Sequence, residues 1–191
     1  KDSNEAILQG KRSELVQAVW NAREFRPDGI KSAQDYRGLI TIDEAASAIT
    51  WPYSQLNDVL RGLHRETLTT ICAGSGTGKT TFCKELIHHL LMHEQKVGVI
   101  ALEESNKRTL LGLVGTHLSK NLLVDRQQAT DDEVLHGFDD LFGNRTCYLF
   151  DHFGSSDVDL ICQRIQYMAK ALDIQWVILD HISILVSAQE G

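Results

Sequence analysis

The stretch Ala73-Gly74-Ser75-Gly76-Thr77-Gly78-Lys79-Thr80 follows the apolar run Leu68 to Cys72 and opens a helical pattern. This order predicts a strand, a glycine-rich loop and a helix, the arrangement of a loop that binds phosphate groups. Glycines let backbone N–H groups surround the phosphates, and the positive end of the helix dipole points towards them. A glycine-rich surface turn that happens to precede Lys-Thr is the alternative, and the correct order of strand and helix disfavours it.

The side chains of this loop have two predicted roles. Lys79 is expected to reach the β- and γ-phosphate oxygens and to act in catalysis, and the Thr80 hydroxyl is expected to bind Mg²⁺. Ala73 stands where the strict pattern has glycine, and a small residue there still permits the turn. The predicted nucleotide-binding residues are Gly74, Ser75, Gly76, Thr77, Gly78, Lys79, Thr80 and Thr81.

The composition limits the function. A chain of 191 residues suffices for one globular domain with a short appendage, although it starts without Met and stops abruptly at Gly191, as an excised segment would. The net charge of −7 and the lack of basic runs give no argument for nucleic acid. No apolar run approaches the ~20 residues that span a bilayer, so no membrane contact is expected. Four dispersed cysteines, read as buried free thiols, favour the cytoplasm: Cys72, Cys83, Cys147 and Cys162.

Strand and helix patterns alternate along the chain. Strands are expected at 67–72, 96–102, 146–150 and 175–180, and helices at 80–93, 106–120, 131–142 and 157–172. Such alternation predicts an α/β fold with a mostly parallel sheet covered by helices on both faces.

The residues before this region predict a short amphipathic helix at 11–22, which the breaker Phe25-Arg26-Pro27-Asp28-Gly29 separates from the body. This helix packs either on its own domain or on a neighbouring copy.

Carboxylates follow two of the expected strands. Asp180 ends the apolar run Trp176 to Leu179, at the sheet edge where the phosphate loop should lie, and is expected to hold Mg²⁺ through its water shell. Glu103 is the expected catalytic base and Glu104 the second choice, because successive side chains of a strand point in opposite directions. Both glutamates also suit the first turn of the following helix as acidic capping residues.

Histidines give weaker indications. His181 and Asp151 follow their strands in the same way and are candidates for the active edge as sensors, or for simple capping of the strand ends. His88, His89 and His93 lack the acidic partner of a His-Glu-x-x-His pattern, so a solvated helix face explains them better than a metal site.

Several motifs in order resemble the hexameric replicative helicases, and more narrowly the T7-type phage primase-helicases, with bacterial replicative helicases and the mitochondrial Twinkle helicase as relatives. The most specific motifs are Leu102-Glu103-Glu104-Ser105 and Ile178-Leu179-Asp180-His181-Ile182-Ser183-Ile184. The others are Trp51-Pro52-Tyr53, Leu56-Asn57, Gly62-Leu63, the loop 73–80 and Asp139 to Asn144.

The resemblance implies a RecA-like core with nucleotide bound between subunits. It implies the same roles for Lys79, Thr80, Glu103 and Asp180 as the residues themselves indicate. Residues 1–10 resemble the end of a primase-like domain, 11–30 a linker helix and tether that docks on the adjacent subunit, and 31–191 the front part of the ATPase domain. The family's DNA-binding loops and arginine finger would follow Gly191, so hydrolysis by this segment alone should be weak.

The activity implied is 5′-to-3′ unwinding of DNA by a ring of six or seven copies, driven by hydrolysis of ATP or dTTP with Mg²⁺. Single-stranded or forked DNA, other copies of the chain and the replicative DNA polymerase are the implied partners.

Three alternatives stay open at this point: a RecA- or KaiC-like regulatory or recombination ATPase, a nucleotide-binding assembly module, and a small-molecule kinase. The kinase is disfavoured because Arg108, Arg126, Arg145 and Arg164 are scattered rather than clustered.

Overall fold

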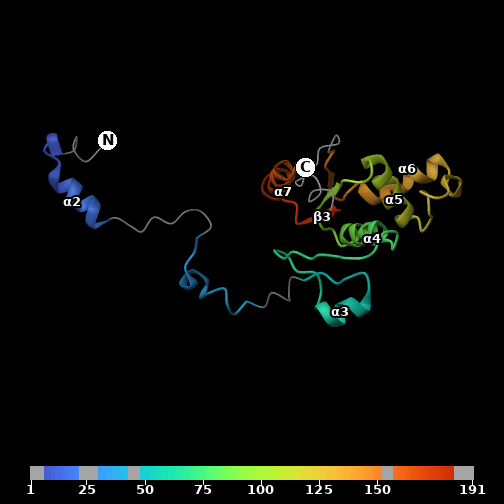
Figure 1. The fold of residues 1–191 in the computed structure, drawn as a ribbon, viewed down its shortest axis with the longest axis horizontal. Coiled ribbons are helices and arrows are strands. Elements are labelled where there is room, and N and C mark those ends of the chain that lie inside the picture. The colour runs from blue at the N-terminus through green and yellow to red at the C-terminus, as the bar shows by residue number, and fades with distance from the viewer. Residues whose placement is uncertain (1–6, 22–29, 43–47, 152–156, 183–191) are drawn as a thin grey trace. The chain divides into compact units, whose positions relative to one another are not determined.

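The computed structural model describes residues 7–21, 30–42, 48–151 and 157–182. The chain divides into two compact units, Lys1–Asp43 and Glu44–Gly191, which follow one another along the chain in Figure 1. The predicted tether at 22–29 and residues 1–6 of the predicted primase-like end lie outside the described residues. The domain boundaries after residues 10 and 30 stay predictions.

The first unit contains the helix that the sequence predicts. Helix α2 spans Arg12–Trp20, and a 3₁₀ turn, η1, spans Ala33–Tyr36. Val16, Val19 and Trp20 of α2 are exposed, and Trp20 is 83% accessible. The described part of this unit therefore leaves these three apolar side chains of its own helix uncovered.

The second unit is built on three parallel strands. The central strand β1 (Val97–Ala101) pairs with β2 (Cys147–Leu149) on one side and with β3 (Trp176–Asp180) on the other. The main helices are α4 (Lys79–Met92), α5 (Asn106–His117), α6 (Asp131–Phe142) and α7 (Val158–Ala171), with the shorter α3 (Ser54–Leu60) and η3 (Arg126–Gln128). Both pairings are parallel, which requires long connections between the paired strands. Helices α5 and α6 form the connection from β1 to β2, and α7 lies in the connection from β2 to β3.

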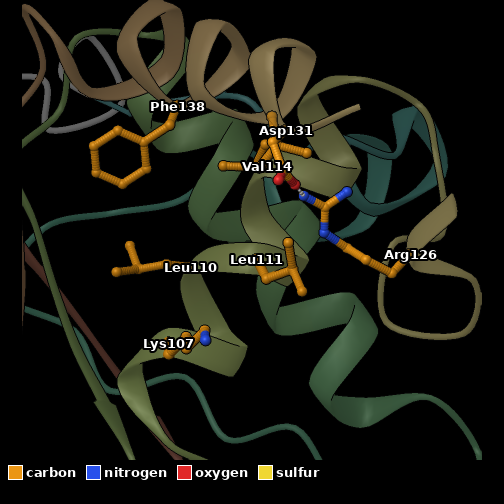
Figure 2. Close-up of a pocket in the computed structure, with 8 residues that line it drawn as sticks. Lys107, Leu110, Leu111, Val114, Arg126, Asp131 and Phe138 are labelled. Atoms are coloured by element: carbon orange, nitrogen blue, oxygen red, sulfur yellow. Dashed lines mark hydrogen bonds and ion pairs between the residues drawn. The ribbon is translucent and has the colours of Figure 1, made fainter. Parts of the chain in front are cut away.

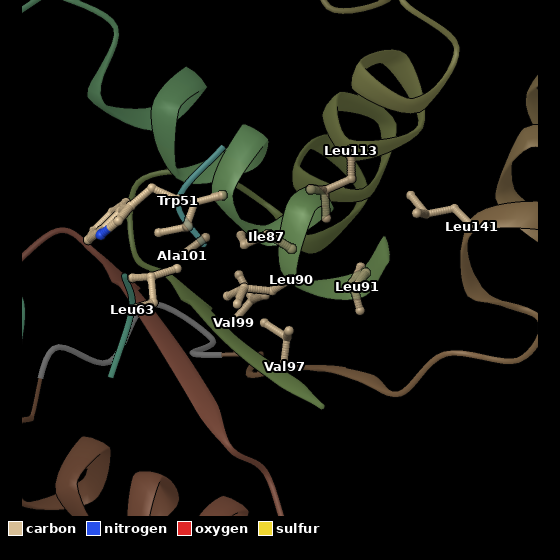
Figure 3. Close-up of a cluster of buried hydrophobic side chains, with 11 residues drawn as sticks. Trp51, Leu63, Ile87, Leu90, Leu91, Val97, Val99, Ala101, Leu113 and Leu141 are labelled. Carbon is tan, nitrogen blue, oxygen red and sulfur yellow. The ribbon is translucent and has the colours of Figure 1, made fainter. Parts of the chain in front are cut away.

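Helices cover both faces of this sheet, as the sequence predicts. Side chains alternate along a strand, and in β1 the residues Val97, Val99 and Ala101 belong to one cluster with Ile87 and Leu90 of α4 (Figure 3). The intervening Ile100 packs with Ile161 of α7 in a second cluster. Gly98 lies under α7 so closely that an added Cβ would stand 2.8 Å from the Met168 sulfur.

A third cluster joins α5 to the segment that leads into α6. It is centred on Val114, Leu122 and Ala129, with Val134 and Phe142 of α6 packed against it. Gly115 permits this approach, since an added Cβ there would lie 2.7 Å from the Lys120 carbonyl oxygen. The helix predicted at 131–142 therefore has an apolar face that holds it to α5.

The expected strand at 67–72 is wrong. In the part of the chain that the structure describes, these residues form no strand and pair with none of the three strands, and Leu68 is 93% exposed. Apolar and threonine residues favour a strand only where a neighbouring strand supplies hydrogen bonds and a face to pack on. No described strand lies beside 67–72, so an unpaired stretch of chain leads into the phosphate loop.

The cysteines are free, as predicted, but the prediction that they are buried is wrong, because none of the four is fully buried. Cys72 and Cys162 are exposed, and Cys83 and Cys147 are partly buried. Burial raises the pKa of Cys83 to about 11 and that of Cys147 to about 12, so both thiols are protonated at neutral pH. Among the described residues, no helix is long and apolar enough to cross a membrane.

Candidate functional site

The glycine-rich loop adopts a conformation that only glycine takes readily. Gly76 and Gly78 have φ angles of 73° and 95°, and Gly78 is the residue directly before α4. Thr77 donates its hydroxyl hydrogen to the Gly74 carbonyl at 2.7 Å. The loop is exposed and leads straight into α4, so its backbone N–H groups and the positive helix end are available to an anion.

Lys79, the first residue of α4, lies folded over this loop. Its ammonium donates to the carbonyl oxygens of Ala73 at 3.0 Å and of Gly74 at 2.9 Å. A phosphate group entering the loop would offer this ammonium charged oxygen acceptors in place of neutral ones.

A cavity of about 340 Å³ lies beside the loop and is lined by Thr80, Thr81, Glu103, Glu104 and Asp180 among the predicted site residues, but not by His181. It is lined from five segments: the start of α4, the chain after β1, the first turn of α5, the chain between α5 and η3, and the end of β3. The lining residues are Thr80, Thr81, Lys84, Glu103, Glu104, Arg108, Leu123 and Asp180. The register of β1 with β3 sets Asp180 opposite Ala101, which is why the carboxylates that follow these two strands share one edge.

The two glutamates after β1 have different surroundings. Glu103 is half exposed, and its Oε1 lies 2.6 Å from Nε2 of His181, the residue after β3. Glu104 is only 11% exposed, and its Oε1 lies 2.8 Å from the Lys84 ammonium. Ser105, not either glutamate, is the N-cap of α5, with its hydroxyl accepting from the Arg108 N–H. The alternative in which Glu103 or Glu104 caps this helix is therefore wrong, because Ser105 is the cap.

Asp180 is a buried carboxylate, 8% exposed, at the end of β3. Its carbonyl accepts a hydrogen bond from the Leu102 N–H at 2.7 Å, which fixes the strand ends together. Its charge adds to the effect of burial in raising the pKa of the Cys83 thiol on α4. The Thr80 hydroxyl and the Asp180 carboxylate are oxygen donors of the kind that Mg²⁺ takes, so the donor set of the cavity fits that ion.

The other predicted constellations have structural partners. His89 Nε2 lies 2.6 Å from the Thr50 carbonyl oxygen and His93 Nδ1 lies 2.8 Å from the His89 carbonyl oxygen. His88 Nε2 lies 3.1 Å from His117 Nδ1, and His117 Nε2 lies 2.7 Å from an Asp140 oxygen. Within the described residues no group of three or more His, Cys, Asp or Glu side chains could hold a metal ion.

A second cavity, of about 610 Å³, lies between α5 and α6. Figure 2 shows Leu110 and Leu111 of α5 facing Phe138 of α6, with the ion pair of Arg126 and Asp131 at one side. None of the predicted site residues lines it. Five of its eight lining residues are apolar, and two of the three charged ones, Arg126 and Asp131, are paired with each other.

Sequence reasoning missed several residues of the first cavity. Lys84, Arg108 and Leu123 line it, and none of them was predicted. Lys84 stands four residues after Thr80 on a helix, so the spacing alone could have placed it on the same helix face.

The glycine-rich loop at the start of α4, beside carboxylates at the ends of two parallel strands, is the arrangement of a P-loop α/β protein. Comparison with known proteins makes this specific. A family profile described as the DnaB-like helicase C-terminal domain matches residues 48–191. The chain therefore belongs to the DnaB-like helicase C-terminal domain family.

A curated relative and a solved structure agree with this assignment. The chain is 31% identical over 199 aligned positions to a DNA helicase/primase of Enterobacteria phage T3, a match that covers all of this chain and 35% of that protein. The chain thus spans about a third of the length of this relative. A structure of a DnaB-like replicative helicase, described with its interactions with primase, matches 96% of this chain and 45% of that chain with a TM-score of 0.60 and 18% identity. This likeness supports the RecA-like fold.

Proposed function

We propose that this chain is the nucleotide-hydrolysing part of a replicative DNA helicase that unwinds DNA in the 5′-to-3′ direction as a ring. The observation that carries the proposal is the cavity beside the phosphate loop, where Thr80, Glu103 and Asp180 come together from three elements. Membership of the DnaB-like family and the similarity to a phage DNA helicase/primase support the same activity.

The loop residues bind the phosphates of an NTP, either ATP or dTTP. Lys79 exchanges the carbonyls of Ala73 and Gly74 for β- and γ-phosphate oxygens. The N–H groups of Gly74 to Thr81 form the remainder of the phosphate site. Thr80 and Asp180 would hold Mg²⁺, which would supply positive charge against the phosphate oxygens.

Glu103 acts as the general base. Its carboxylate takes a proton from the water that attacks the γ-phosphorus, while the bond between that phosphorus and the β–γ bridging oxygen breaks and the NDP leaves. The imidazole of His181, 2.6 Å from Glu103 Oε1, orients this carboxylate at the cavity mouth. Glu104 is not available for this role, because its oxygens are held by Lys84, Thr109 and Arg108.

The partners follow from the same family. Single-stranded or forked DNA is the track, six or seven copies of the chain form the ring, and a replicative DNA polymerase works beside it. Helix α2 packs its exposed Val19 and Trp20 on another copy, which removes these apolar side chains from water. The protein works in the cytoplasm, in the host cytoplasm if it is a phage protein.

Glu103→Gln in the whole protein tests the assignment of the base. The variant keeps the side-chain shape, so Mg-nucleotide should bind within about threefold of the wild-type affinity while hydrolysis falls by about 100-fold or more. Lys96→Met, which removes the exposed ion pair with Asp173, is the matched control and should leave both unchanged. Retention of more than a tenth of wild-type turnover by Glu103→Gln would contradict the role.

A further inference from the structure

A buried ion pair lies in the wall of the cavity beside the loop. It joins α4, which carries the proposed Mg²⁺ ligand Thr80, to the residues after β1, which include the proposed base Glu103. Lys84 of α4 and Glu104, which follows β1, have side chains that are 8% and 11% exposed, and their charged atoms are 2.8 Å apart. Lysine and glutamate are rarely buried to this extent unless they are paired. Because both side chains are buried and paired, the ammonium and the carboxylate are fixed relative to each other, whereas the long side chains of an exposed pair would be free to move apart.

Glu104 is bound from α5 as well. Thr109, which is buried, donates its hydroxyl to Glu104 Oε1 at 2.9 Å, and Arg108 Nε lies 3.5 Å from Oε2. Both carboxylate oxygens thus have cationic or hydroxyl partners, and the side chain is fixed from two helices. Because Glu103 is the next residue along the backbone, the conformation of Glu104 constrains where the Glu103 carboxylate can lie.

Lys84 is placed as closely as Glu104. Gly112 of α5 leaves room for it: an added Cβ there would lie 2.9 Å from Cδ and Cε of Lys84 and 3.0 Å from its Nζ. Lys84 is also one helical turn after Thr80, so a rigid turn of α4 links the ammonium to the proposed Mg²⁺ ligand.

We propose that Lys84 and Glu104 are positioning residues for nucleotide hydrolysis: their ion pair fixes the start of α4, which carries Thr80, against the end of β1, which is followed by Glu103. This inference rests on the proposed function, in which Glu103 is the base. The pair sets the separation between the γ-phosphate held by the loop and the base, on which the rate of water attack depends.

A purely structural role makes a different prediction. Replacing both members of a buried ion pair by apolar or neutral residues of similar size is often neutral for stability, whereas removing one member is destabilising. If the pair only supports the fold, the double variant Lys84→Met with Glu104→Gln should recover both melting temperature and turnover. If the pair positions the base, the double variant should recover melting temperature alone.

The experiment measures NTP hydrolysis, affinity for a non-hydrolysable Mg-nucleotide and melting temperature in the whole protein, for Lys84→Met, Glu104→Gln and the double variant. We expect kcat of the double variant to fall about 10- to 100-fold, with KM and nucleotide affinity within about threefold of wild type. Lys96→Met with Asp173→Asn removes an exposed ion pair of two residues that precede β1 and β3; it is the matched control and should leave kcat unchanged.

Gly112→Ala gives a second measurement that keeps both charges. Alanine has a higher helix propensity than glycine, but its methyl group would displace the Lys84 ammonium. We expect kcat to fall at least fivefold, with affinity for the non-hydrolysable Mg-nucleotide within about threefold of wild type. Wild-type kcat in both the double variant and Gly112→Ala would overturn the positioning role.

The failure of this inference is distinguishable from the failure of the proposed function. If Glu103→Gln abolishes hydrolysis but the double variant and Gly112→Ala hydrolyse normally, Glu103 is the base and Lys84 and Glu104 do not position it. If Glu103→Gln also hydrolyses normally, the base itself is misassigned, and a positioning role towards it is overturned together with that assignment.

Discussion

Replacing Lys79 by Met should weaken nucleotide binding by one to two orders of magnitude without unfolding the protein. In the structure the Lys79 ammonium makes two hydrogen bonds to carbonyls of its own loop, at 3.0 and 2.9 Å. Under the proposed function, phosphate oxygens replace these partners on binding, and one hydrogen bond to a charged group contributes about 1.5–3 kcal/mol. At about 1.4 kcal/mol per tenfold change in Kd, the loss corresponds to roughly 10- to 150-fold.

Titration calorimetry with a non-hydrolysable Mg-nucleotide measures this change, with thermal unfolding in parallel. Methionine has nearly the length of lysine and suits a helix, so the melting temperature should stay close to that of the wild type. Lys96→Met again supplies the same substitution away from the loop. A Kd within threefold of the wild-type value would contradict this prediction, because it would mean that Lys79 does not contact the phosphates.

Three further predictions concern the scaffold. Leu113→Ala on α5 removes a fully buried side chain and should cost about 3–5 kcal/mol of unfolding free energy in a urea titration; a loss below 1 kcal/mol would show that the site is not close-packed. Thr130→Ala breaks the reciprocal capping of α6 with Glu133 and should cost about 1 kcal/mol by the same method, with no effect expected on nucleotide affinity. Burial, and then the neighbouring His117, His89 and Arg145, lower the pKa of His88 from its ordinary value of 6.5. As the pH drops from 7 to 5, the unfolded chain therefore binds more protons at His88 than the folded chain does, and the free energy of unfolding should fall. His88→Gln should reduce the dependence of the free energy of unfolding on pH. An unchanged dependence would exclude His88 as a cause of the lower stability at low pH.

Much of the fold could be predicted because it depends on local periodicity. The three described strands and the four main helices of the second unit lie where the apolar patterns put them, within a few residues at each end. The strand at 67–72 failed because pairing is a property of two segments, and the residues of one segment cannot show whether a partner exists. The helix at 131–142 was predicted, but the face of it that packs on α5 was not.

The site could be predicted where one motif or one strand end determines it. The loop, Thr80, Glu103 and Asp180 come together because parallel strands place their carboxyl ends at one edge. The partners of Glu104 could not be predicted, because they depend on how α4 packs against α5 at Lys84 and Gly112. The pairing of His181 with Glu103 likewise depends on the register of β3 with β1.

The proposal that this chain is part of a DNA helicase is best tested by measuring hydrolysis of ATP and dTTP by the whole protein, with and without single-stranded DNA. Unwinding of a forked duplex is measured in parallel. We expect single-stranded DNA to stimulate hydrolysis and the fork to be unwound in the 5′-to-3′ direction. We expect Lys79→Ala to abolish both the stimulated hydrolysis and the unwinding. Nucleotide binding with hydrolysis that does not respond to DNA, and no unwinding, would contradict the helicase and favour a regulatory or assembly ATPase.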